Sequence, residues 1–412
     1  MPSFHASLCQ MRGMDIIMER TKIINCKIIT PYRVLDKGTI IIENGVISYA
    51  GCVDVTVQDA IVIDAQDNYA APGFIDIHTH GGGGYDFMDA TAQAYLGAAE
   101  AHARYGTTSI VPTTLTGSND GLRQTFEAFR QARSQNKMGA ELLGIHLEGP
   151  YFSMEQKGAQ DPRYIRAPQK VEYEKILQWS DNIIRWSAAP EIKGALEFGR
   201  YAGNKGVLMS IGHSDAIGEE VAEAFENGYT HITHLYSAMS GVKRINGLRF
   251  SGVIESAFLI DEMTVEIIAD GIHLPADMLS LVYKIKGPSR TVLVTDSMRA
   301  AGMGGGPSIL GSLKDGTEVF VEDGVAKLPD RKAFAGSVAT ADRLVRTMVK
   351  LAGVPLIDAI RMISSTPARV LGIDRTKGSL VPGKDADIVI FDRDINIKAT
   401  IIKGNMVYGG GL

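Results

Sequence analysis

The sequence has few cysteines, no long hydrophobic run and no excess of basic residues. Only 3 of its 412 residues are cysteine (Cys9, Cys26 and Cys52), and their spacing matches neither a disulfide framework nor a metal motif. We therefore expect a reducing, cytoplasmic location. No apolar run approaches the roughly 20 residues that span a bilayer. The formal net charge of −5 lacks the basic footprint of a nucleic-acid-binding domain. Neither a membrane nor a nucleic acid is an expected partner.

The first 19 residues lack the apolar stretch and the cleavage site of a secretory signal. They also lack helical or strand periodicity, so we predict a disordered extension over residues 1–19. Three internal methionines in this extension (Met11, Met14 and Met18) leave the true start of translation open.

Short stretches rich in β-branched residues occur at both ends of the chain and predict strands. They cover residues 21–30, 38–51, 60–65, 386–394 and 395–410. The Asn44-Gly45 pair favours a hairpin turn because both residues tolerate a positive φ. We predict a small β-sandwich domain built from both termini, over residues 20–70 and 374–412.

Between these ends, apolar strands alternate with helical stretches, which is typical of a parallel α/β fold. Eight candidate strands cover residues 73–78, 107–113, 142–148, 183–189, 206–212, 230–235, 264–270 and 291–296. Eight such units predict a (β/α)8 TIM barrel over residues 71–373. A doubly wound open sheet is the alternative, but no glycine fingerprint opens a helix here.

The first barrel strand ends in a pair of histidines followed by four glycines, PGFIDIHTHGGGG. Alternation along a strand places Phe74, Asp76, His78 and His80 on one face. Two imidazoles on one face can bind the same metal ion. The glycines permit a sharp turn directly after the second histidine.

Other polar residues end the remaining strands, where the active sites of TIM barrels lie. The strand ends carry His78, His80, Glu148, His213, His234, Asp270, His273 and Asp296. Each residue alone is compatible with a structural role, such as a hydrogen bond or a helix cap, and their clustering is what indicates function. His231 differs in strand parity from His234, so we predict that it faces out of the barrel. His5 and His102 are predicted to be structural or exposed. His146 lies on the same face of its strand as Glu148.

Histidine nitrogens and a carboxylate suit zinc and are compatible with iron, cobalt or manganese. Glu148, His213 and His234 would leave one coordination position open, as catalytic metal sites do. Asp296 could then take a proton from an activated water and return it to a leaving group. His78 and His80 could bind a second ion that shares Glu148 or Asp296, so one or two ions per chain are expected.

These motifs, in this order, resemble the amidohydrolase superfamily and, within it, the N-acetylglucosamine-6-phosphate deacetylases. The resemblance runs from about residue 20 to the end of the chain. It is carried by PGFIDIHTHG, HLEGPYFS with KGAQDP, IGHSDA, THLYSAM, ADGIH, LVTDSM and FAGSVAT. It implies a phosphorylated amino sugar as substrate and hydrolysis of its N-acetyl group. It also leaves a homodimer open, since members of the family commonly form dimers.

The resemblance implies roles for individual residues. It implies Glu148, His213 and His234 as metal ligands, Asp296 as general base and acid, and His78 with His80 as the position of a second metal in some members. Arg244 and His273 match residues that contact the sugar phosphate. Ala159, Ala238, Phe334, Ala335 and Gly336 match positions that line the substrate site.

Two positions depart from the family pattern. Gln160 stands where the family usually has histidine after KGA, and Ser237 stands where THLYNAM has asparagine. A glutamine amide can donate a hydrogen bond but cannot carry a proton or a charge. Both departures fall in the expected substrate shell. They leave a related sugar open, such as N-acetylgalactosamine 6-phosphate or an unphosphorylated N-acetylhexosamine. A cyclic amidase and a non-catalytic sugar-binding protein are weaker alternatives.

Overall fold

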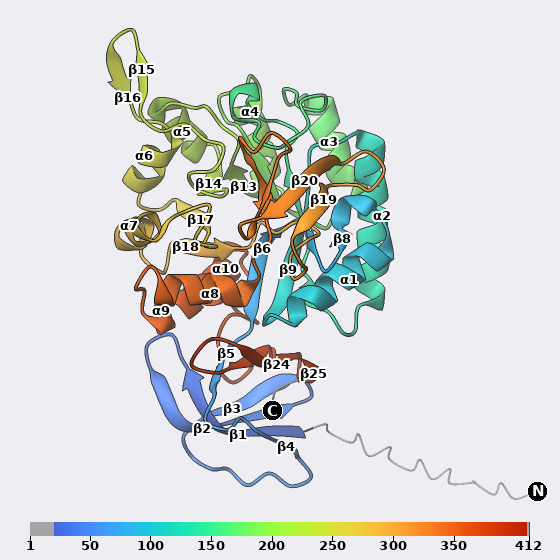
Figure 1. Cartoon of the computed structure of the whole chain (residues 1–412), viewed down its shortest axis with the longest axis vertical. Helices are drawn as coiled ribbons and strands as arrows, with labels where there is room; N and C mark the ends of the chain where they lie inside the picture. The colour runs from blue at the N-terminus through green and yellow to red at the C-terminus, as the bar shows by residue number, and fades with distance from the viewer. Residues whose placement is uncertain (1–19, 410–411) are drawn as a thin grey trace, which may run out of the picture.

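The computed structural model describes residues 20–409 and 412. The predicted extension over residues 1–19 therefore lies outside the described residues, as do His5 and Cys9. The described chain forms a barrel with a smaller sheet domain below it (Figure 1). None of the described helices is long and apolar enough to cross a membrane.

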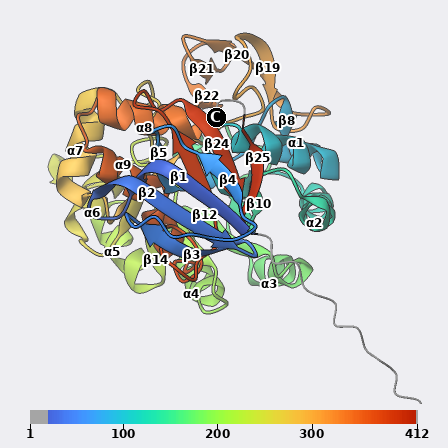
Figure 2. The same ribbon diagram turned by 90° about the horizontal axis from the view of Figure 1, so that it is seen from below.

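The smaller domain combines strands from both ends of the chain, which lie side by side in Figure 2. Its 8-stranded sheet has the order β25-β24-β23-β5-β1-β2-β3, with β4 beside β1. These strands are β1 (Arg20–Ile29), β2 (Val34–Glu43), β3 (Val46–Gly51), β4 (Ile61–Asp64), β5 (Tyr69–Pro72), β23 (Ile388–Phe391), β24 (Ile397–Ile402) and β25 (Asn405–Tyr408). The predicted hairpin turn between β2 and β3 is confirmed, because Asn44 and Gly45 have φ values of 52° and 78°.

This domain has a core of its own. Ile23, Ile28, Ile40, Ile388 and Ile401 are fully or almost fully buried and belong to one cluster that is separate from the barrel core. The strands β1 and β2 supply one part of the cluster, while β23 and β24 supply the other. The pairing of β5 with both β1 and β23 joins the two chain ends into one sheet. The fold prediction of a barrel with a β-sandwich domain from both termini is confirmed.

The barrel strands follow one another in parallel. They are β6 (Phe74–Thr79), β9 (Thr107–Thr114), β10 (Glu141–Leu142), β11 (Ile145–Glu148), β12 (Ile183–Ala188), β13 (Leu208–Ile211), β14 (Tyr229–Ile232), β17 (Thr264–Ile268) and β18 (Thr291–Val294). The short β10 and β11 both pair with β9, so together they form the third strand that we predicted as one. The proposed domain limits near residues 70 and 373 stay a prediction about which segments fold as units.

Hydrogen bonds between the ends of the last and first strands close the barrel. The backbone N–H of Asp296 donates to the carbonyl of His78 over 2.9 Å, and that of His80 donates to the carbonyl of Ser297 over 2.8 Å. This closure excludes the doubly wound open sheet. It also brings residues that follow β18 next to the histidines at the end of β6.

Helices cover the outside of the barrel (Figure 1). They are α1 (Ala92–Ala103), α2 (Asn119–Gln135), α3 (Lys170–Trp179), α4 (Ala195–Gly203), α5 (Gly218–Glu226), α6 (Val253–Leu259), α7 (Ala276–Lys286), α8 (Ala341–Lys350), α9 (Leu356–Ile363) and α10 (Ser365–Val370). Short 3-10 turns, η1 (Phe87–Asp89) and η2 (Met154–Gln156), follow the ends of β8 and β11. Side chains such as Phe129, Trp186 and Phe198 fill the layer between helices and strands, and all are fully buried.

Three small sheets sit at the carboxyl ends of the barrel strands. The four glycines after His80 make a tight hairpin of β7 (Gly81–Gly82) and β8 (Tyr85–Asp86), as predicted. A protruding hairpin of β15 (Lys243–Ile245) and β16 (Leu248–Phe250) extends from the barrel in Figure 1. The third sheet consists of β19 (Gly306–Leu310), β20 (Thr317–Glu322), β21 (Val325–Lys327) and β22 (Phe334–Ser337).

Candidate active site

Polar side chains from five strands converge at the carboxyl end of the barrel. His78 and His80 come from the end of β6, Glu148 ends β11, and His213, His234 and Asp296 follow β13, β14 and β18. All are buried. The last three have positive φ values of 49°, 29° and 46°. Such backbone is uncommon for residues other than glycine and often occurs at functional sites.

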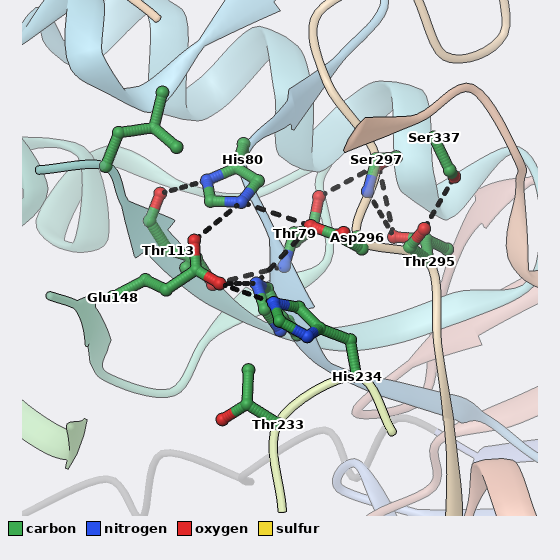
Figure 3. A network of polar contacts seen from close by, with 12 residues as sticks. Thr79, His80, Thr113, Glu148, Thr233, His234, Thr295, Asp296, Ser297 and Ser337 are labelled. Atoms are coloured by element: carbon green, nitrogen blue, oxygen red, sulfur yellow. Dashed lines mark hydrogen bonds and ion pairs between the residues drawn. The ribbon is translucent and has the colours of Figure 1, made fainter. Parts of the chain in front are cut away.

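The carboxylate of Glu148 lies at the centre of this group (Figure 3). Its Oε1 is 3.0 Å from His234 Nε2 and 3.4 Å from the Nε2 atoms of both His213 and His78. Its Oε2 is 3.4 Å from His80 Nε2. Glu148 therefore faces all four histidines that we predicted as ligands.

The four histidines divide into two sets around Glu148. One set is His78 with His80, and the other is His213 with His234. In each set, one donor atom from each histidine and one oxygen of Glu148 lie within 4.8 Å of one another. Imidazole nitrogens with one carboxylate oxygen suit a divalent metal such as zinc. His78 Nε2 is also buried without a hydrogen-bond partner, which is the state expected of a ligand atom. The residues present therefore fit a metal at either position, with Glu148 shared between them.

The surrounding histidines alter the acidity of Glu148. Burial alone raises the pKa of its carboxyl, but the charge of His78 and hydrogen bonds from His213 and His234 outweigh burial and hold the pKa well below its usual range. The same opposition acts on Asp296. Burial raises its pKa, and His78 and His80 lower it further than burial raises it. Both carboxyls are thus ionised, as a metal ligand and a general base must be.

Asp296 lies on the His78–His80 side of the group. Its Oδ1 is 3.1 Å from His80 Nε2 and 3.4 Å from His78 Nε2 (Figure 3). It also lines the cavity in front of Glu148. The carboxylate can therefore meet both a water molecule held near the histidines and a substrate in the cavity.

A cavity of about 480 Å³ opens onto these residues. Most of the predicted substrate residues line it, namely Ala159, Gln160, Ser237, Ala238, His273, Phe334 and Gly336. Ala335 is fully buried and is not among the lining residues. We did not predict the lining by Leu115, Gln156, Tyr236, Ile268 and Leu310. Leu115 and Tyr236 lie in loops, Ile268 and Leu310 end strands, and Gln156 ends a 3-10 turn. None of these positions carries a sequence signal that would mark it as a pocket residue.

The structure does not bring Arg244 to this cavity. Arg244 is exposed on the protruding β15–β16 hairpin and is not among the lining residues. Its predicted contact with a sugar phosphate therefore stays a prediction. In contrast, His273 lines the cavity, where its ring packs against Phe334 at a centroid distance of 4.8 Å. Its Nδ1 is 2.8 Å from Asp270 Oδ2, which leaves Nε2 as the ring nitrogen free to face the cavity.

The prediction that His231 faces out of the barrel is wrong. His231 is fully buried, pairs in register with Ser210, and has its Nε2 3.4 Å from Glu266 Oε2 inside the barrel. The parity argument fails because β14 ends at Ile232, and His234 has left-handed backbone beyond the strand. Alternation along a strand therefore does not relate the two histidines.

The remaining buried histidines support the site from outside. His146 Nε2 is 2.6 Å from the hydroxyl of Ser187, and its ring packs against that of His78. His102 is buried rather than exposed, with its Nε2 3.0 Å from the carbonyl oxygen of Gly81 in the turn after His80. Both have hydrogen-bonding roles instead of facing the cavity.

Comparison with known proteins identifies the family. The family model described as "Amidohydrolase family" matches residues 69–407. The chain belongs to the amidohydrolase family. This agrees with the superfamily resemblance that the motifs carry and with the metal-binding geometry around Glu148.

Individual relatives are similar over nearly the whole chain. An N-acetylglucosamine-6-phosphate deacetylase of Bacillus subtilis is 36% identical over 387 residues, covering 92% of this chain and 95% of the relative. An N-acetylgalactosamine-6-phosphate deacetylase of Escherichia coli O157:H7 is 34% identical, covering 90% and 95%. A solved N-acetylglucosamine-6-phosphate deacetylase from Pasteurella multocida superposes with a TM-score of 0.87 at 30% identity, covering 94% of this chain and 99% of that chain.

Proposed function

We propose that this protein hydrolyses the N-acetyl group of N-acetylglucosamine 6-phosphate, giving glucosamine 6-phosphate and acetate in amino-sugar breakdown. The proposal rests on the surroundings of Glu148. Two pairs of histidines flank this carboxylate, and both Glu148 and Asp296 line a cavity of about 480 Å³. The names of the relatives support the same chemistry and a phosphorylated amino sugar.

A divalent metal, when bound by Glu148, His213 and His234, supplies the Lewis acidity that activates water and polarises an amide carbonyl. Asp296 accepts the proton of the attacking water as the new C–O bond forms at the acetyl carbon. It then gives this proton to the amide nitrogen as the C–N bond breaks. Acetate and a free amine leave, and Asp296 is ionised again for the next turnover.

The ring of His273, together with Phe334, is proposed to bind the far end of the sugar, where the 6-phosphate would lie. Because Nδ1 donates a hydrogen bond to Asp270, Nε2 is left to face the cavity, and in the imidazolium form Nε2 carries a proton that it can donate to a phosphate oxygen. Arg244 could join this contact only if the hairpin moves or if the hairpin of a second copy reaches the cavity. We therefore keep a homodimer as a prediction, which size-exclusion chromatography with light scattering would test.

We propose zinc as the resident metal, with iron, cobalt and manganese as compatible ions, and a cytoplasmic location. The two ligand sets around Glu148 support a capacity for two ions. Metal analysis of the purified protein by mass spectrometry would give both identity and number.

The decisive experiment is acetate release from N-acetylglucosamine 6-phosphate before chelation, after chelation and after metal is restored. We expect activity that chelation abolishes and metal restores. N-acetylgalactosamine 6-phosphate and free N-acetylglucosamine should be assayed beside it, because Gln160 and Ser237 depart from the family pattern and one relative is named for the galactosamine substrate. A higher kcat/KM on either sugar would overturn the proposed substrate while leaving the deacetylation in place.

Two other functions find less support. Many cyclic amidases bridge their metals with a modified lysine at the end of the fourth strand, whereas Glu148 is shared here and no lysine is among the residues that line the cavity. A non-catalytic sugar-binding protein would not need an ionised Asp296 at the base of the cavity. Binding of the sugar without acetate release by the metal-loaded protein would favour it.

A further inference from the structure

A buried ion pair lies inside the barrel beneath the histidines. Arg185 on β12 and Glu266 on β17 are both fully buried, and Arg185 Nη1 is 2.6 Å from Glu266 Oε2. A buried pair of this kind loses much of its attraction to the cost of desolvation and is weak support for a role in stability. Its contacts point to another role.

Glu266 contacts one histidine from each of the two ligand sets. Its Oε1 is 2.6 Å from His78 Nδ1 and also accepts a hydrogen bond from the backbone N–H of His234 over 3.0 Å. A single carboxylate oxygen therefore fixes the ring of His78 and the backbone that carries His234.

Arg185 prevents this carboxylate from turning away. Besides Glu266, the guanidinium donates to the carbonyl of Ile77 over 3.0 Å, to the hydroxyl of Ser210 over 3.1 Å and to that of Thr233 over 3.1 Å. These partners come from β6, from β13 and from the residue just beyond β14. The planar guanidinium is thereby held by three barrel segments and holds Glu266 in turn.

The contact with Glu266 selects one tautomer of His78. A carboxylate only accepts hydrogen bonds, so the proton of a neutral His78 must lie on Nδ1 and the lone pair on Nε2. Nε2 points to Glu148 Oε1 and Asp296 Oδ1, each 3.4 Å away, and it has no hydrogen-bond partner. A carboxylate that orients a ligating imidazole in this way is a common support of metal sites.

We propose that Glu266, held by Arg185, is a positioning residue that presents His78 Nε2 to a second metal ion at His78, His80 and Glu148. The same carboxylate links this position to the first one through the backbone of His234. This inference rests on the proposed metal site, but its readout is the metal content of the protein and not deacetylation.

The test is the number and affinity of bound ions in Glu266→Gln. A glutamine has a single oxygen, so its NH₂ group must face either Arg185 or His78 Nδ1. The first arrangement sets two donors against each other and breaks the hold of Arg185 on residue 266, while the second reverses the tautomer of His78. After chelation and saturation with zinc, we expect two ions per chain in the wild-type protein and about one in the variant. The affinity for the second ion should fall about 10–100-fold.

Further variants separate positioning from folding. Glu266→Asp keeps two acceptor oxygens and should restore part of the second-ion affinity. The double variant Arg185→Met with Glu266→Met removes the whole pair without leaving one charge unpaired, so it should fold and still lose the second ion. Asp387→Asn is the matched control, because it also removes a buried carboxylate that pairs with a cation, Lys377, and it should keep two ions.

Two results would overturn the proposal. One is a wild-type protein that holds a single ion at saturating zinc. The other is a second-ion affinity that is unchanged in Glu266→Gln or, should that variant not fold, in the double variant. If the stoichiometry changes as expected while no N-acetyl sugar releases acetate, the role of Glu266 stands and the proposed function fails.

Discussion

Gln160 donates a hydrogen bond from Nε2 to Glu148 Oε2 over 2.7 Å, and its Oε1 accepts one from the backbone N–H of Thr116 over 2.9 Å. The contact with Thr116 fixes which end of the amide faces Glu148. Gln160 was expected to contact substrate, and it lines the cavity, but its amide is already engaged with the central carboxylate. It therefore orients Glu148 in a way that the sequence did not indicate.

Replacing Gln160 with leucine should free the Glu148 carboxylate to rotate. We expect metal affinity and kcat/KM each to fall about 10–100-fold, the range seen when a group that orients a metal ligand is lost. A chelator competition titration measures the first quantity. Gln156→Leu is the control, since Gln156 lines the same cavity but its side chain bonds to Asp215. Unchanged metal affinity in Gln160→Leu would show that Glu148 needs no such support.

Asp296→Asn should remove proton transfer while keeping the shape of the site. An amide cannot accept the proton of the attacking water, so we expect kcat to fall about 10²–10⁴-fold. The ion held by Glu148, His213 and His234 should be retained, which metal analysis of the same sample would check. Near-normal kcat in a metal-loaded Asp296→Asn protein would rule out Asp296 as the general base.

His273→Leu tests the binding of the sugar phosphate. Losing a hydrogen bond to a charged group costs about 1.5–3 kcal/mol, so KM for the 6-phosphate should rise at least tenfold. KM for the unphosphorylated sugar should stay the same. Phe334→Leu is the control, because it alters the apolar wall beside His273 without removing a donor. An equal rise in KM for both sugars would mean that His273 shapes the cavity rather than recognises phosphate.

The sequence predicted the barrel and the ligand histidines because both depend on local order. Six of the eight predicted strands end at or next to the polar residues of the site, and parallel strands bring their carboxyl ends together whatever the loops do. Sequence-based prediction fails for side chains that lie beyond the end of a strand or that interact across the barrel. His231 was misplaced because the chain leaves strand geometry before His234. Arg244 lies on a hairpin outside the cavity, so its predicted contact with the sugar phosphate stays a prediction.

Arg185 and Glu266 were missed although a signal was present. Each is a lone charge within an otherwise apolar or weakly polar strand, IIRWSA and TVEII. A charge in a strand that is buried on both faces needs an opposite charge nearby. One sequence does not show which strands face each other across the barrel, so the pairing could not be derived.

The pH dependence of stability should contain a contribution from His102. Burial lowers its pKa from 6.5 to about 4, although the Gly81 carbonyl bond acts in the opposite direction. The unfolded chain therefore binds one proton more than the folded chain between these pH values. The free energy of unfolding should fall as pH drops from 6.5 to 4, by up to about 3 kcal/mol from this residue.

Urea unfolding of the metal-free protein across this pH range would measure the effect, with His102→Gln as comparison. The variant lacks the titrating group, so its stability should decline less steeply below pH 6.5. Parallel pH profiles for the two proteins would show that His102 titrates alike in the folded and unfolded states.

Lys377 holds the terminal sheet against the barrel. Its Nζ lies 2.7 Å from Glu141 Oε2 on β10, 2.9 Å from Asp385 Oδ2 and 2.6 Å from Asp387 Oδ2, just before β23. These three carboxylates are close enough together to hold a metal ion. The lysine charge already occupies their centre, and Lys377 is only 5% exposed.

Lys377→Met should leave three neighbouring carboxylates without their cation. Breaking a buried ion pair on one side costs about 3–5 kcal/mol, and this loss should appear in urea unfolding. The kcat/KM should not change, because Glu141 lies at the opposite end of the third barrel strand from Glu148. Lys350→Met removes the exposed pair with Asp394 and should cost less than about 1 kcal/mol. A Lys377→Met protein as stable as the Lys350→Met protein would mean that the carboxylates take up protons at little cost. The terminal sheet would then be held to the barrel mainly by apolar packing.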